Sequence, residues 1–344
     1  MTGRRLKVVM FAPHFAEYAL RAAIGLAQGA DVLAIFDTHV LDREVSPVLG
    51  LTHPNVTILA VDFGVRGQSR FDFPGLVAAI DAFAPDIIHH QEQLPQVSLA
   101  LMARFRATSA QVLMVHDPQS HGSAVYALDA ATRSLILRTR RAADRILVHG
   151  PVNETQLRAT DPDLTVPVSH TQHGVMLVPP PALLRAPEPR RVLMFGWMVE
   201  HKGVDVAVAA ATILNRGGAP VTFHLAGSGS EPARQRESIA AAGNIVVDDR
   251  FLPPEEAIAA FQRSALAILP YREGTQSGVL ASALGNGRPA IVSRGGDFPG
   301  LVTDGVNGFV VRPGDAAALA AAIARALDTP GLVQELAAGA RTTA

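Results

Sequence analysis

Three segments in the second half of the chain join the end of an apolar run to residues that suit phosphate. They read FGWMVEHKG (195–203), LAGSGSE (225–231) and YREGTQSGVLASALGNGRPAIVS (271–293). The first contains Lys202, one of only two lysines in the chain, beside a glycine at a predicted helix start. A compact ammonium group and the open N–H groups of a helix start both bind phosphate well. A solvated surface lysine is an equally simple interpretation of Lys202 alone.

The third segment offers the most hydrogen-bond donors, and it opens a helix of small residues. Its small residues leave backbone amides open, and its polar residues add side-chain donors. The residues concerned are Gly274, Thr275, Gln276, Ser277 and Gly278. The second segment, with Gly227 and Gly229, is weak evidence alone, because many strand-to-helix turns look like it. Three such loops in one domain together predict a phosphorylated ligand.

Short apolar runs alternate with alanine-rich helical patterns along almost the whole chain. The predicted strands are 7–12, 31–36, 56–61, 86–90, 111–116, 145–149, 166–171, 191–196, 221–227, 244–249, 265–270, 289–293 and 308–312. The predicted helices include 17–28, 73–83, 95–107, 123–143, 203–216, 231–242, 254–263 and 315–327. Continuous apolar strands separated by helices are typical of parallel sheets that are covered on both faces. The fold class is therefore α/β.

A proline-rich stretch, VPPPALLRAPEPRR (178–191), interrupts this alternation. Prolines mixed with charged residues are typical of a stiff linker. We therefore expect an N-terminal domain over 1–178, a linker over 179–191 and a C-terminal domain over 192–344. Both domains are expected to be Rossmann-like and doubly wound, and to face a central cleft. Ligands of such sheets bind at the carboxyl ends of the strands.

Composition excludes several classes of protein. The chain has 344 residues, 30 basic and 31 acidic side chains, and no cysteine. A nucleic-acid-binding domain is normally basic, so nucleic acid is not expected as a partner. Thiolate chemistry and disulfides are excluded, and no apolar run approaches the length of a membrane span. The start of the chain lacks the pattern of a signal peptide, so a cytoplasmic location is expected.

The order and spacing of these segments resemble retaining GT-B glycosyltransferases of the family 4 type. The resemblance rests on the three segments above together with FLPPEEAIAAFQRSALAILPY and DGVNGFVVRPGD, and it covers about 190–328. A looser likeness in the first half rests on VHDP (115–118), RAADRILVHG (141–150) and QHGV (172–175). The chain stops after LVQELAAGARTTA, where the family generally continues through a helix back to the first domain. Either this chain is short or that crossing is made differently.

The resemblance implies transfer of a sugar from a nucleotide-diphosphate donor to a hydroxyl acceptor, with retention and without an essential metal. UDP or GDP is the expected nucleotide, and a carbohydrate, lipid-linked or small molecule the expected acceptor. The donor would lie on the C-terminal domain, with Lys202 binding phosphate. The other implied donor-binding residues are Gly196, Gly227, Gly229, Thr275, Gln276, Ser277 and Gly278. The acceptor would lie on the N-terminal domain, with 38–55 and 62–72 as its determinants.

The chain departs from the family pattern at three positions near the donor site. Trp197 stands where the family usually has arginine, so Arg272 or Arg294 is a candidate for the missing charge. A core anchor is the simpler interpretation of Trp197. Gly274 and Ser282 stand where the family usually has glutamates. The nearby Glu273 is then the candidate to reach a sugar hydroxyl, and a solvated loop acid is its alternative.

His116, at the end of QVLMVH (111–116), resembles the active-site histidine of the family. Its imidazole could bond a sugar hydroxyl, and its titration range permits acid–base work. His14 lies in the first strand-to-helix loop, where the family often has glycines that approach phosphate. His173 is expected to serve the turn between domains. The remaining histidines show no metal-ligand spacing, so no metal site is expected.

Other interpretations stay open. A non-catalytic nucleotide- or sugar-binding protein of the same fold would accommodate the three departures. A sugar-nucleotide epimerase fits the architecture, and a periplasmic-type binding protein fits it without an export signal. The first strand–turn lacks GxGxxG, which disfavours a dehydrogenase, and no GxSxG is present for a hydrolase. The arginine-rich segment Arg133–Arg145 is either a peripheral membrane contact or the outer face of a helix.

Overall fold

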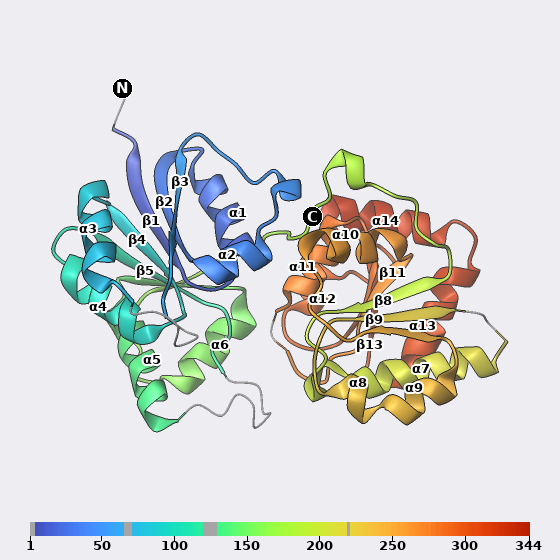
Figure 1. Cartoon of the computed structure of the whole chain (residues 1–344). Helices are drawn as coiled ribbons and strands as arrows, with labels where there is room; N and C mark the ends of the chain where they lie inside the picture. Colours follow the sequence, from blue (N-terminus) through green and yellow to red (C-terminus); the bar gives the residue numbers. More distant parts are fainter. Residues whose placement is uncertain (1–3, 65–70, 120–128, 219–220, 275) are drawn as a thin grey trace. The chain divides into compact units, whose positions relative to one another are not determined.

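The computed structural model describes residues 4–64, 71–119, 129–218, 221–274 and 276–344. These residues form two compact units that divide between Gly174 and Val175. We call them unit 1, up to Gly174, and unit 2, from Val175 onward. Each is an α/β domain in which helices cover a parallel sheet (Figure 1). The predicted pair of doubly wound α/β domains is confirmed.

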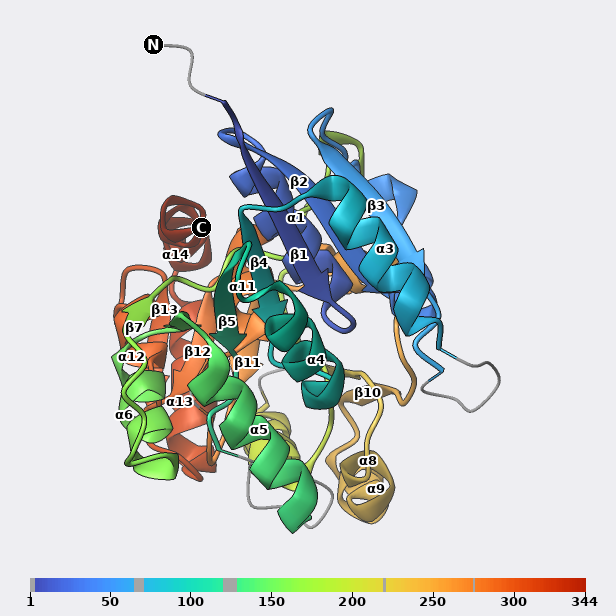
Figure 2. The same cartoon turned by 90° about the vertical axis from the view of Figure 1, so that its left-hand side faces the viewer.

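Unit 1 contains a seven-stranded sheet in the order β3-β2-β1-β4-β5-β6-β7, with all neighbours parallel. Its elements are β1 (Leu6–Ala12), α1 (Ala16–Leu26), β2 (Ala30–Asp37), α2 (Thr38–Glu44), the 3-10 turn η1 (Pro47–Leu49), β3 (Val56–Val61), α3 (Phe73–Phe83), β4 (Ile87–Gln91), α4 (Pro95–Phe105), β5 (Ala110–Val115), α5 (Ala130–Ala142), β6 (Arg145–Val148), α6 (Pro151–Thr160) and β7 (Val168–His170). Figure 2 shows α3, α4 and α5 along one face of this sheet. The strand order reverses direction between β1 and β4, and ligands of such sheets bind at the carboxyl ends there.

The core of unit 1 explains why its strands are continuous apolar runs. Phe11 of β1, Ile35 of β2 and Ile88 of β4 are fully buried in one cluster with side chains of α3 and α4. Strands covered on both faces need apolar side chains on both. Some polar side chains are buried as well, and β4 carries three of them near its carboxyl end: His89, His90 and Gln91. These three lie toward the ligand-binding edge of the sheet.

Unit 2 contains a six-stranded parallel sheet in the order β10-β9-β8-β11-β12-β13. Its elements are η3 (Pro181–Leu183), β8 (Arg191–Phe195), η4 (Glu200–Lys202), α7 (Val204–Arg216), β9 (Thr222–Ala226), α8 (Glu231–Arg234), α9 (Arg236–Ala242), β10 (Ile245–Asp248), α10 (Pro254–Arg263), β11 (Leu266–Leu269), α11 (Gly278–Gly285), β12 (Ala290–Ser293), α12 (Phe298–Leu301), β13 (Gly308–Val311), α13 (Ala316–Asp328) and α14 (Leu332–Thr343). Met194, Phe223 and Ile268 are buried with side chains of α7 and α13. The strand order reverses between β8 and β11, so the loops after these two strands share one edge.

The segment before β8 packs on unit 2. The buried side chain of Asn286 donates from Nδ2 to Leu177 O at 2.8 Å. Gln262 Oε1 accepts from Arg185 N at 3.2 Å and from Arg288 Nη2 at 2.9 Å. These bonds tie 177–185 to α10 and to the loop after α11. The division between units therefore lies before residue 175, four residues earlier than the expected boundary at 178.

All thirteen strands lie within two residues of their predicted bounds. The helices differ more. The predicted helix 231–242 is two helices, α8 and α9, because Gln235 between them leaves the helical conformation. The predicted helix 123–143 is described only from Ala130, after the cap that Asp129 gives to Thr132 N. Among the described residues, four helices lie outside the predicted ranges named above: α2, α6, α12 and α14. Of the expected acceptor loops, 38–55 begins with α2, and much of 62–72 lies outside the described residues.

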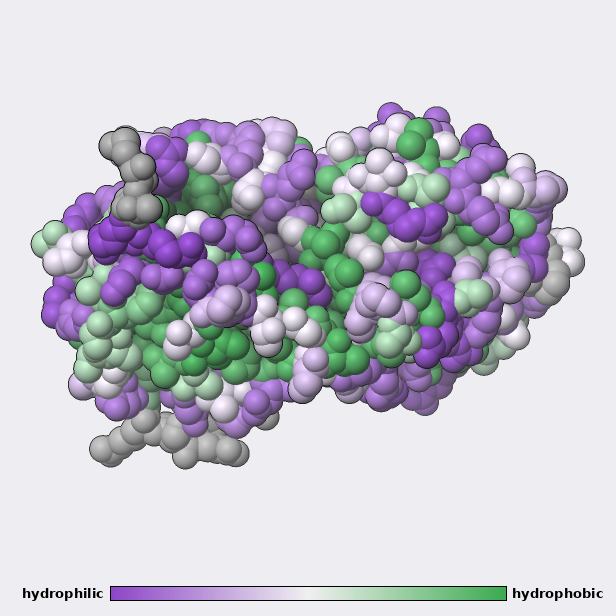
Figure 3. Space-filling view, turned by 90° about the horizontal axis from the view of Figure 1, so that it is seen from above, coloured by the Kyte–Doolittle hydropathy of each residue, from purple (hydrophilic) through white to green (hydrophobic). Residues whose placement is uncertain are grey.

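Apolar side chains also reach the surface of both units, as the mixed colouring of Figure 3 shows for one face. Within the described residues, three of the large exposed hydrophobic side chains are aromatic: Phe15, Trp197 and Phe251. Each follows the carboxyl end of a parallel strand by two or three residues. That is the ligand-binding edge of an α/β sheet, so these three residues are informative. No single described helix is long and apolar enough to cross a membrane; α13 and α14 qualify only as a pair bent by 103°.

Candidate functional site

Two loops of unit 2 meet at the edge where the strand order reverses. The loop after β8 runs from Gly196 to Gly203, and the loop after β11 runs from Pro270 to Ser277. The backbone N–H of Arg272 donates to His201 O at 2.7 Å. A Cβ on Gly203 would lie 2.1 Å from Pro270 O. The two loops are therefore in direct backbone contact.

Gly203 makes this contact because it lacks a side chain and turns the chain. Its φ is +72°, a left-handed conformation that side-chain-bearing residues rarely adopt. Gly203 follows the end of η4 and precedes α7. The turn therefore fixes the backbone next to Lys202. Any larger residue here would push the two loops apart.

The ammonium group of Lys202 lies over the ring of Tyr271, with Nζ 3.9 Å from the ring centroid. The ring is only 3% exposed, and its hydroxyl lies 3.4 Å from Ser277 Oγ. A cation–π contact on a buried ring, with a partly exposed cation, is worth about 1 kcal/mol. Among the described residues, no carboxylate lies within ion-pair distance of Lys202. A neutral ring thus holds the cation, and its N–H groups stay available to an anion.

The N-terminus of α11 follows the same loop. Its first residue is Gly278, and the preceding Ser277 gives it no side-chain cap. The first amides of a helix have no partner within the helix and attract negative charge. Gln276 Oε1 is also buried there, without a hydrogen-bond partner in the described part of the chain. Lys202 and these amides flank Tyr271 and Ser277, which gives a site with the chemistry for phosphate. Thr275 lies outside the described residues.

The third predicted loop packs against the first. A Cβ on Gly227 would lie 1.9 Å from Gly196 O, and one on Gly229 would lie 2.0 Å from Met198 O. Gly196 N donates to Ala226 O at 2.9 Å. The structure thus brings all three predicted loops together. The two glycines of the third are required by backbone packing, which accounts for them without a ligand.

The residues that depart from the family pattern behave in different ways. Trp197 is 53% exposed, so its interpretation as a core anchor is wrong. Arg272 is paired with Asp205, whereas the exposed Arg294 has no ion pair among the described residues. Ser282 is buried and donates its hydroxyl to Gly278 O at 2.7 Å within α11. Glu273 is exposed, and no ion pair joins it to another described residue.

His116 of unit 1 lies in a buried cluster. Its Nε2 lies 2.6 Å from Gln91 Oε1, and its Nδ1 lies 3.3 Å from His149 Nε2. An amide oxygen only accepts, so in this arrangement His116 donates from Nε2 and accepts at Nδ1. The rings of Tyr18 and His173 complete the cluster, with His173 4.8 Å from His149 between centroids. His173 therefore belongs to this cluster as well as to the turn.

Burial keeps this cluster uncharged. Burial, and then the neighbouring His149 and His173, hold the pKa of His116 well below its usual range. Burial likewise lowers the pKa of His149 to about 4. A ring that stays neutral at pH 7, with both nitrogens bonded, is poorly suited to donate a proton. A catalytic role of His116 stays a prediction.

Sequence reasoning did not connect His149 with His116. Both residues directly follow strands, β5 and β6, and these strands are parallel neighbours in the sheet. Residues at equivalent carboxyl ends of adjacent parallel strands lie side by side. That positional equivalence is the signal that identifies the pair.

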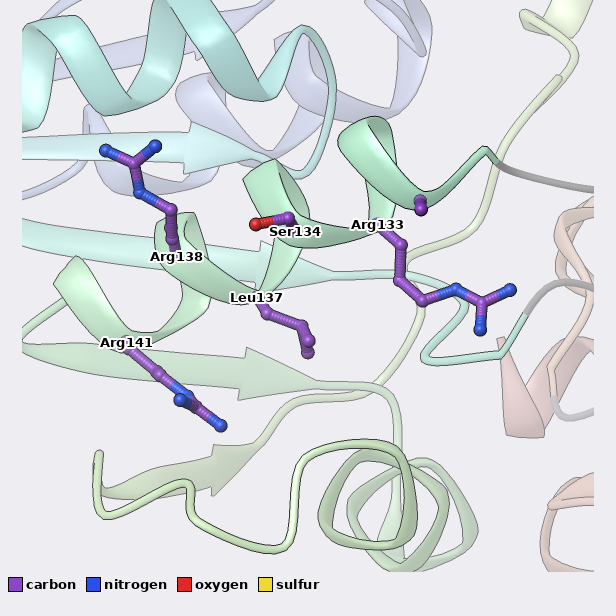
Figure 4. Close-up of a pocket in the computed structure, with 6 residues that line it drawn as sticks. Arg133, Ser134, Leu137, Arg138 and Arg141 are labelled. Carbon is purple, nitrogen blue, oxygen red and sulfur yellow. The ribbon is translucent and has the colours of Figure 1, made fainter.

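The arginine-rich helix α5 carries a shallow hollow lined by Ala130, Arg133, Ser134, Leu137, Arg138 and Arg141. Figure 4 shows Arg133 and Arg138 pointing away from one another. Arg140 is buried against Glu92, and Arg141 is paired with Asp161. Much of the charge in this segment is therefore used inside unit 1. Peripheral membrane contact stays a prediction. The described residues contain no group of three or more side chains that could hold a metal ion.

Comparison with known proteins agrees with this architecture. Residues 189–329, most of unit 2, match the family model described as "Glycosyl transferases group 1". The chain is 30% identical to the amylovoran biosynthesis glycosyltransferase AmsK of Erwinia amylovora over 146 aligned residues. The alignment covers 40% of this chain and 36% of AmsK. It is 25% identical over 272 residues to a glycogen synthase of Mycobacterium tuberculosis. That alignment covers 76% of this chain and 64% of the glycogen synthase. The chain thus spans about a third to two thirds of these relatives.

Solved structures match over nearly the whole chain. A sucrose-phosphate synthase from Thermosynechococcus elongatus has a TM-score of 0.71 at 17% identity, covering 98% of this chain and 94% of that one. Anabaena HepE in complex with UDP-glucose has a TM-score of 0.70 at 15% identity, with the same coverage. The catalytic domain of Arabidopsis thaliana starch synthase IV, bound to ADP and acarbose, has a TM-score of 0.70 at 15% identity, covering 98% and 96%. The chain therefore has the two-domain GT-B fold, and most of unit 2 is similar to the group 1 glycosyltransferase family.

We predict that Gly203→Ala lowers the unfolding free energy by about 2–4 kcal/mol, because the new methyl group meets Pro270 O and the residue keeps a positive φ. Urea unfolding followed by circular dichroism measures this. Gly295→Ala is the control, since no atom lies within 4 Å of its Cβ position. Equal stability of both variants would contradict the close contact.

We predict that stability falls as the pH drops from 7 to 5. A histidine whose pKa is about 4 when folded, as for His149, takes up its proton near pH 6.5 when unfolded. The stabilisation that the neutral ring gives to the folded state is therefore present above pH 6.5 and is lost on acidification. The loss in unfolding free energy between pH 7 and 5 is about 2 kcal/mol. His149→Gln should weaken the pH dependence by that amount in urea unfolding at both pH values. An identical dependence in the two proteins would contradict the neutral cluster.

Proposed function

We propose that the chain is a glycosyltransferase of the family 4 type, which moves a sugar from a nucleotide-diphosphate donor to a hydroxyl acceptor. The observation that carries this proposal is Lys202, held on the ring of Tyr271 beside the uncapped N-terminus of α11. The match of unit 2 to group 1 glycosyltransferases supports it. The relatives and structures named above include a glycosyltransferase, a glycogen synthase and a sucrose-phosphate synthase, and one structure holds UDP-glucose.

The chemistry of this site suits a departing diphosphate. As the glycosidic bond to the donor breaks, negative charge grows on the phosphate oxygens. A fixed ammonium and fixed backbone amides stabilise that charge without reorganising, which is the most effective form of electrostatic catalysis. Lys202 and the first amides of α11 would supply this stabilisation. We therefore propose that transfer needs no metal ion, and that UDP or GDP is the leaving group.

We further propose that transfer retains the anomeric configuration. Retention through a covalent intermediate needs a carboxylate held beside the sugar. In the described donor loops, Glu273 is exposed, and the serine at position 282 bonds its own helix. This favours attack of the acceptor from the side of the leaving group, with a departing phosphate oxygen as the base. Glu273 would then bond a sugar hydroxyl.

His116 would act as a neutral hydrogen-bond partner of the donor sugar. Gln91 and His149 hold its ring nitrogens at 2.6 and 3.3 Å. The longer contact, to His149, is the weaker one, so it would be released first to a sugar hydroxyl. This assigns His116 a role in orientation and removes the need for it to carry charge.

A second candidate is a nucleotide-binding protein without turnover. Trp197 favours it, because an exposed indole cannot replace the charge of the arginine that the family usually has at this position. Such a protein would bind the diphosphate and leave the donor intact.

We predict that Lys202→Ala lowers affinity for UDP or GDP at least tenfold, a loss of about 1.4 kcal/mol, and leaves nucleoside affinity unchanged. Loss of the ammonium removes a phosphate contact and spares the base and ribose. Thermal-shift titration with UDP, GDP, uridine and guanosine measures this. Lys7→Ala is the matched control, because Lys7 is the other lysine and also lies over an aromatic ring, that of Phe83. Equal loss for nucleoside and diphosphate would remove Lys202 from the phosphate site.

We predict that donor consumption persists in EDTA and that the product keeps the anomeric configuration of the donor. Proton NMR of the reaction with UDP-glucose or GDP-mannose and simple sugar acceptors reports both. An inverted product would rule out retention, and activity abolished by EDTA would rule out metal independence. Diphosphate binding without turnover of either donor would favour the non-catalytic candidate.

A further inference from the structure

The loop after β1 lies at the reversal point of the sheet in unit 1, where an α/β domain binds its ligand. It contains Pro13, His14 and Phe15, and it leads into α1. The equivalent edge of unit 2 has the chemistry of a phosphate site. The edge of unit 1 carries an aromatic ring, a neutral imidazole and a carboxylate in its place.

Phe15 holds an aromatic ring at the surface in a strained backbone. The side chain is 41% exposed, although Phe11, four residues earlier, is fully buried. Its φ of 57° and ψ of 48° are left-handed, which is unusual for a bulky residue. Its ring lies 4.9 Å from the ring of His116 between centroids. Strained residues cluster at ligand-binding positions, and this one presents a flat apolar face beside the proposed sugar-orienting histidine.

The N-terminus of α1 is already occupied by negative charge. The carboxylate of Glu44, from α2, accepts from Ala16 N at 2.8 Å. Glu17, in the first turn, is buried and pairs with Arg21 at 2.8 Å. The nearby cation Arg43 pairs with Glu44 at 2.8 Å. The helix amide and both cations are therefore committed, and a phosphate at this edge would lie near the carboxylate of Glu44.

His14 supplies a polar group next to the ring. It is partly buried, and burial lowers its pKa, so its imidazole is neutral at pH 7. No hydrogen bond joins this imidazole to another described residue. A neutral imidazole has one N–H donor and one acceptor, which matches a sugar hydroxyl.

We infer that this edge of unit 1 binds an uncharged sugar ring of the acceptor, stacked on Phe15 and hydrogen-bonded to His14. The inference rests on the proposed function and narrows the acceptor to a glycosyl group that carries no phosphate at this position. The C–H face of a sugar packs on an aromatic ring, while its hydroxyls need neutral polar partners. The carboxylate of Glu44 disfavours a phosphorylated sugar at the same place.

The test uses saturation-transfer NMR on the full chain with methyl α-glucoside, methyl α-mannoside and methyl β-galactoside, each beside the 6-phosphate of the parent sugar. We expect at least one neutral glycoside to bind, and its phosphorylated counterpart to bind at least about tenfold more weakly. Phe15→Gly should weaken glycoside binding roughly five- to tenfold, and Phe15→Trp should retain it. Tighter binding of a phosphorylated sugar, or no binding of any glycoside, would overturn the inference.

Stability separates a binding role of Phe15 from a packing role. Phe15→Gly relieves the positive φ and removes a ring that is 41% exposed, so the melting temperature should stay or rise. Ala84→Gly is the matched control, because Ala84 has a φ of 52° at the end of α3. It should raise the melting temperature and leave glycoside binding unchanged. A fall of more than about 5 °C in Phe15→Gly would assign the ring to packing and overturn the inference.

The increase in melting temperature that UDP and GDP give is measured on the same variants. Loss of glycoside binding with this shift intact supports the acceptor site in unit 1. An intact UDP or GDP shift without glycoside binding would overturn this inference and leave the proposed donor site standing. Absence of both would overturn the proposed function as well.

Discussion

The approach of Gly203 to Pro270 O is the constraint on which the proposed donor loops of unit 2 depend. It is possible only because β8 and β11 are neighbours at the point where the strand order reverses. The turn at Gly203 then directs Lys202 onto the ring of Tyr271. A free lysine side chain loses about 2 kcal/mol of rotamer entropy when an anion orders it. Here the ring orders the ammonium group in advance, so less of that cost falls on binding.

The two units share a topology and treat the same edge in opposite ways. In unit 2 the first turn of α11 has no side-chain cap, and a lysine without a carboxylate partner among the described residues lies nearby. In unit 1 the carboxylate of Glu44 occupies the first amide of α1. Both helices carry the same dipole, so the difference is set by side chains alone. One edge favours anions and the other disfavours them, which matches the proposed charged donor and the inferred uncharged acceptor.

The strands and the donor loops could be predicted because their signals are local. Continuous apolar runs identify buried parallel strands, and Lys202 is recognisable from its place after a strand and before a helix. The contacts that define the sites join distant residues. Glu44 reaches the amide of Ala16 across 28 residues, and His149 reaches His116 across 33. The error at Trp197 has a local cause: Gly196, with a φ of 100°, turns the chain out of the sheet. Apolar composition alone could not indicate that turn.

The neutral histidines of unit 1 bear on where charge is handled in the proposed reaction. His116 and His149 are uncharged at pH 7 because burial disfavours their protonated forms. His14 is uncharged for the same reason. None of these rings can then stabilise the growing charge of the leaving group, nor can they readily remove a proton from an acceptor hydroxyl. In the proposed reaction, charge stabilisation would fall to Lys202 and the amides of α11, and the departing phosphate oxygen would take the proton. The low proton affinity of these rings therefore supports the proposed mechanism, in which the leaving group accepts the proton of the acceptor hydroxyl.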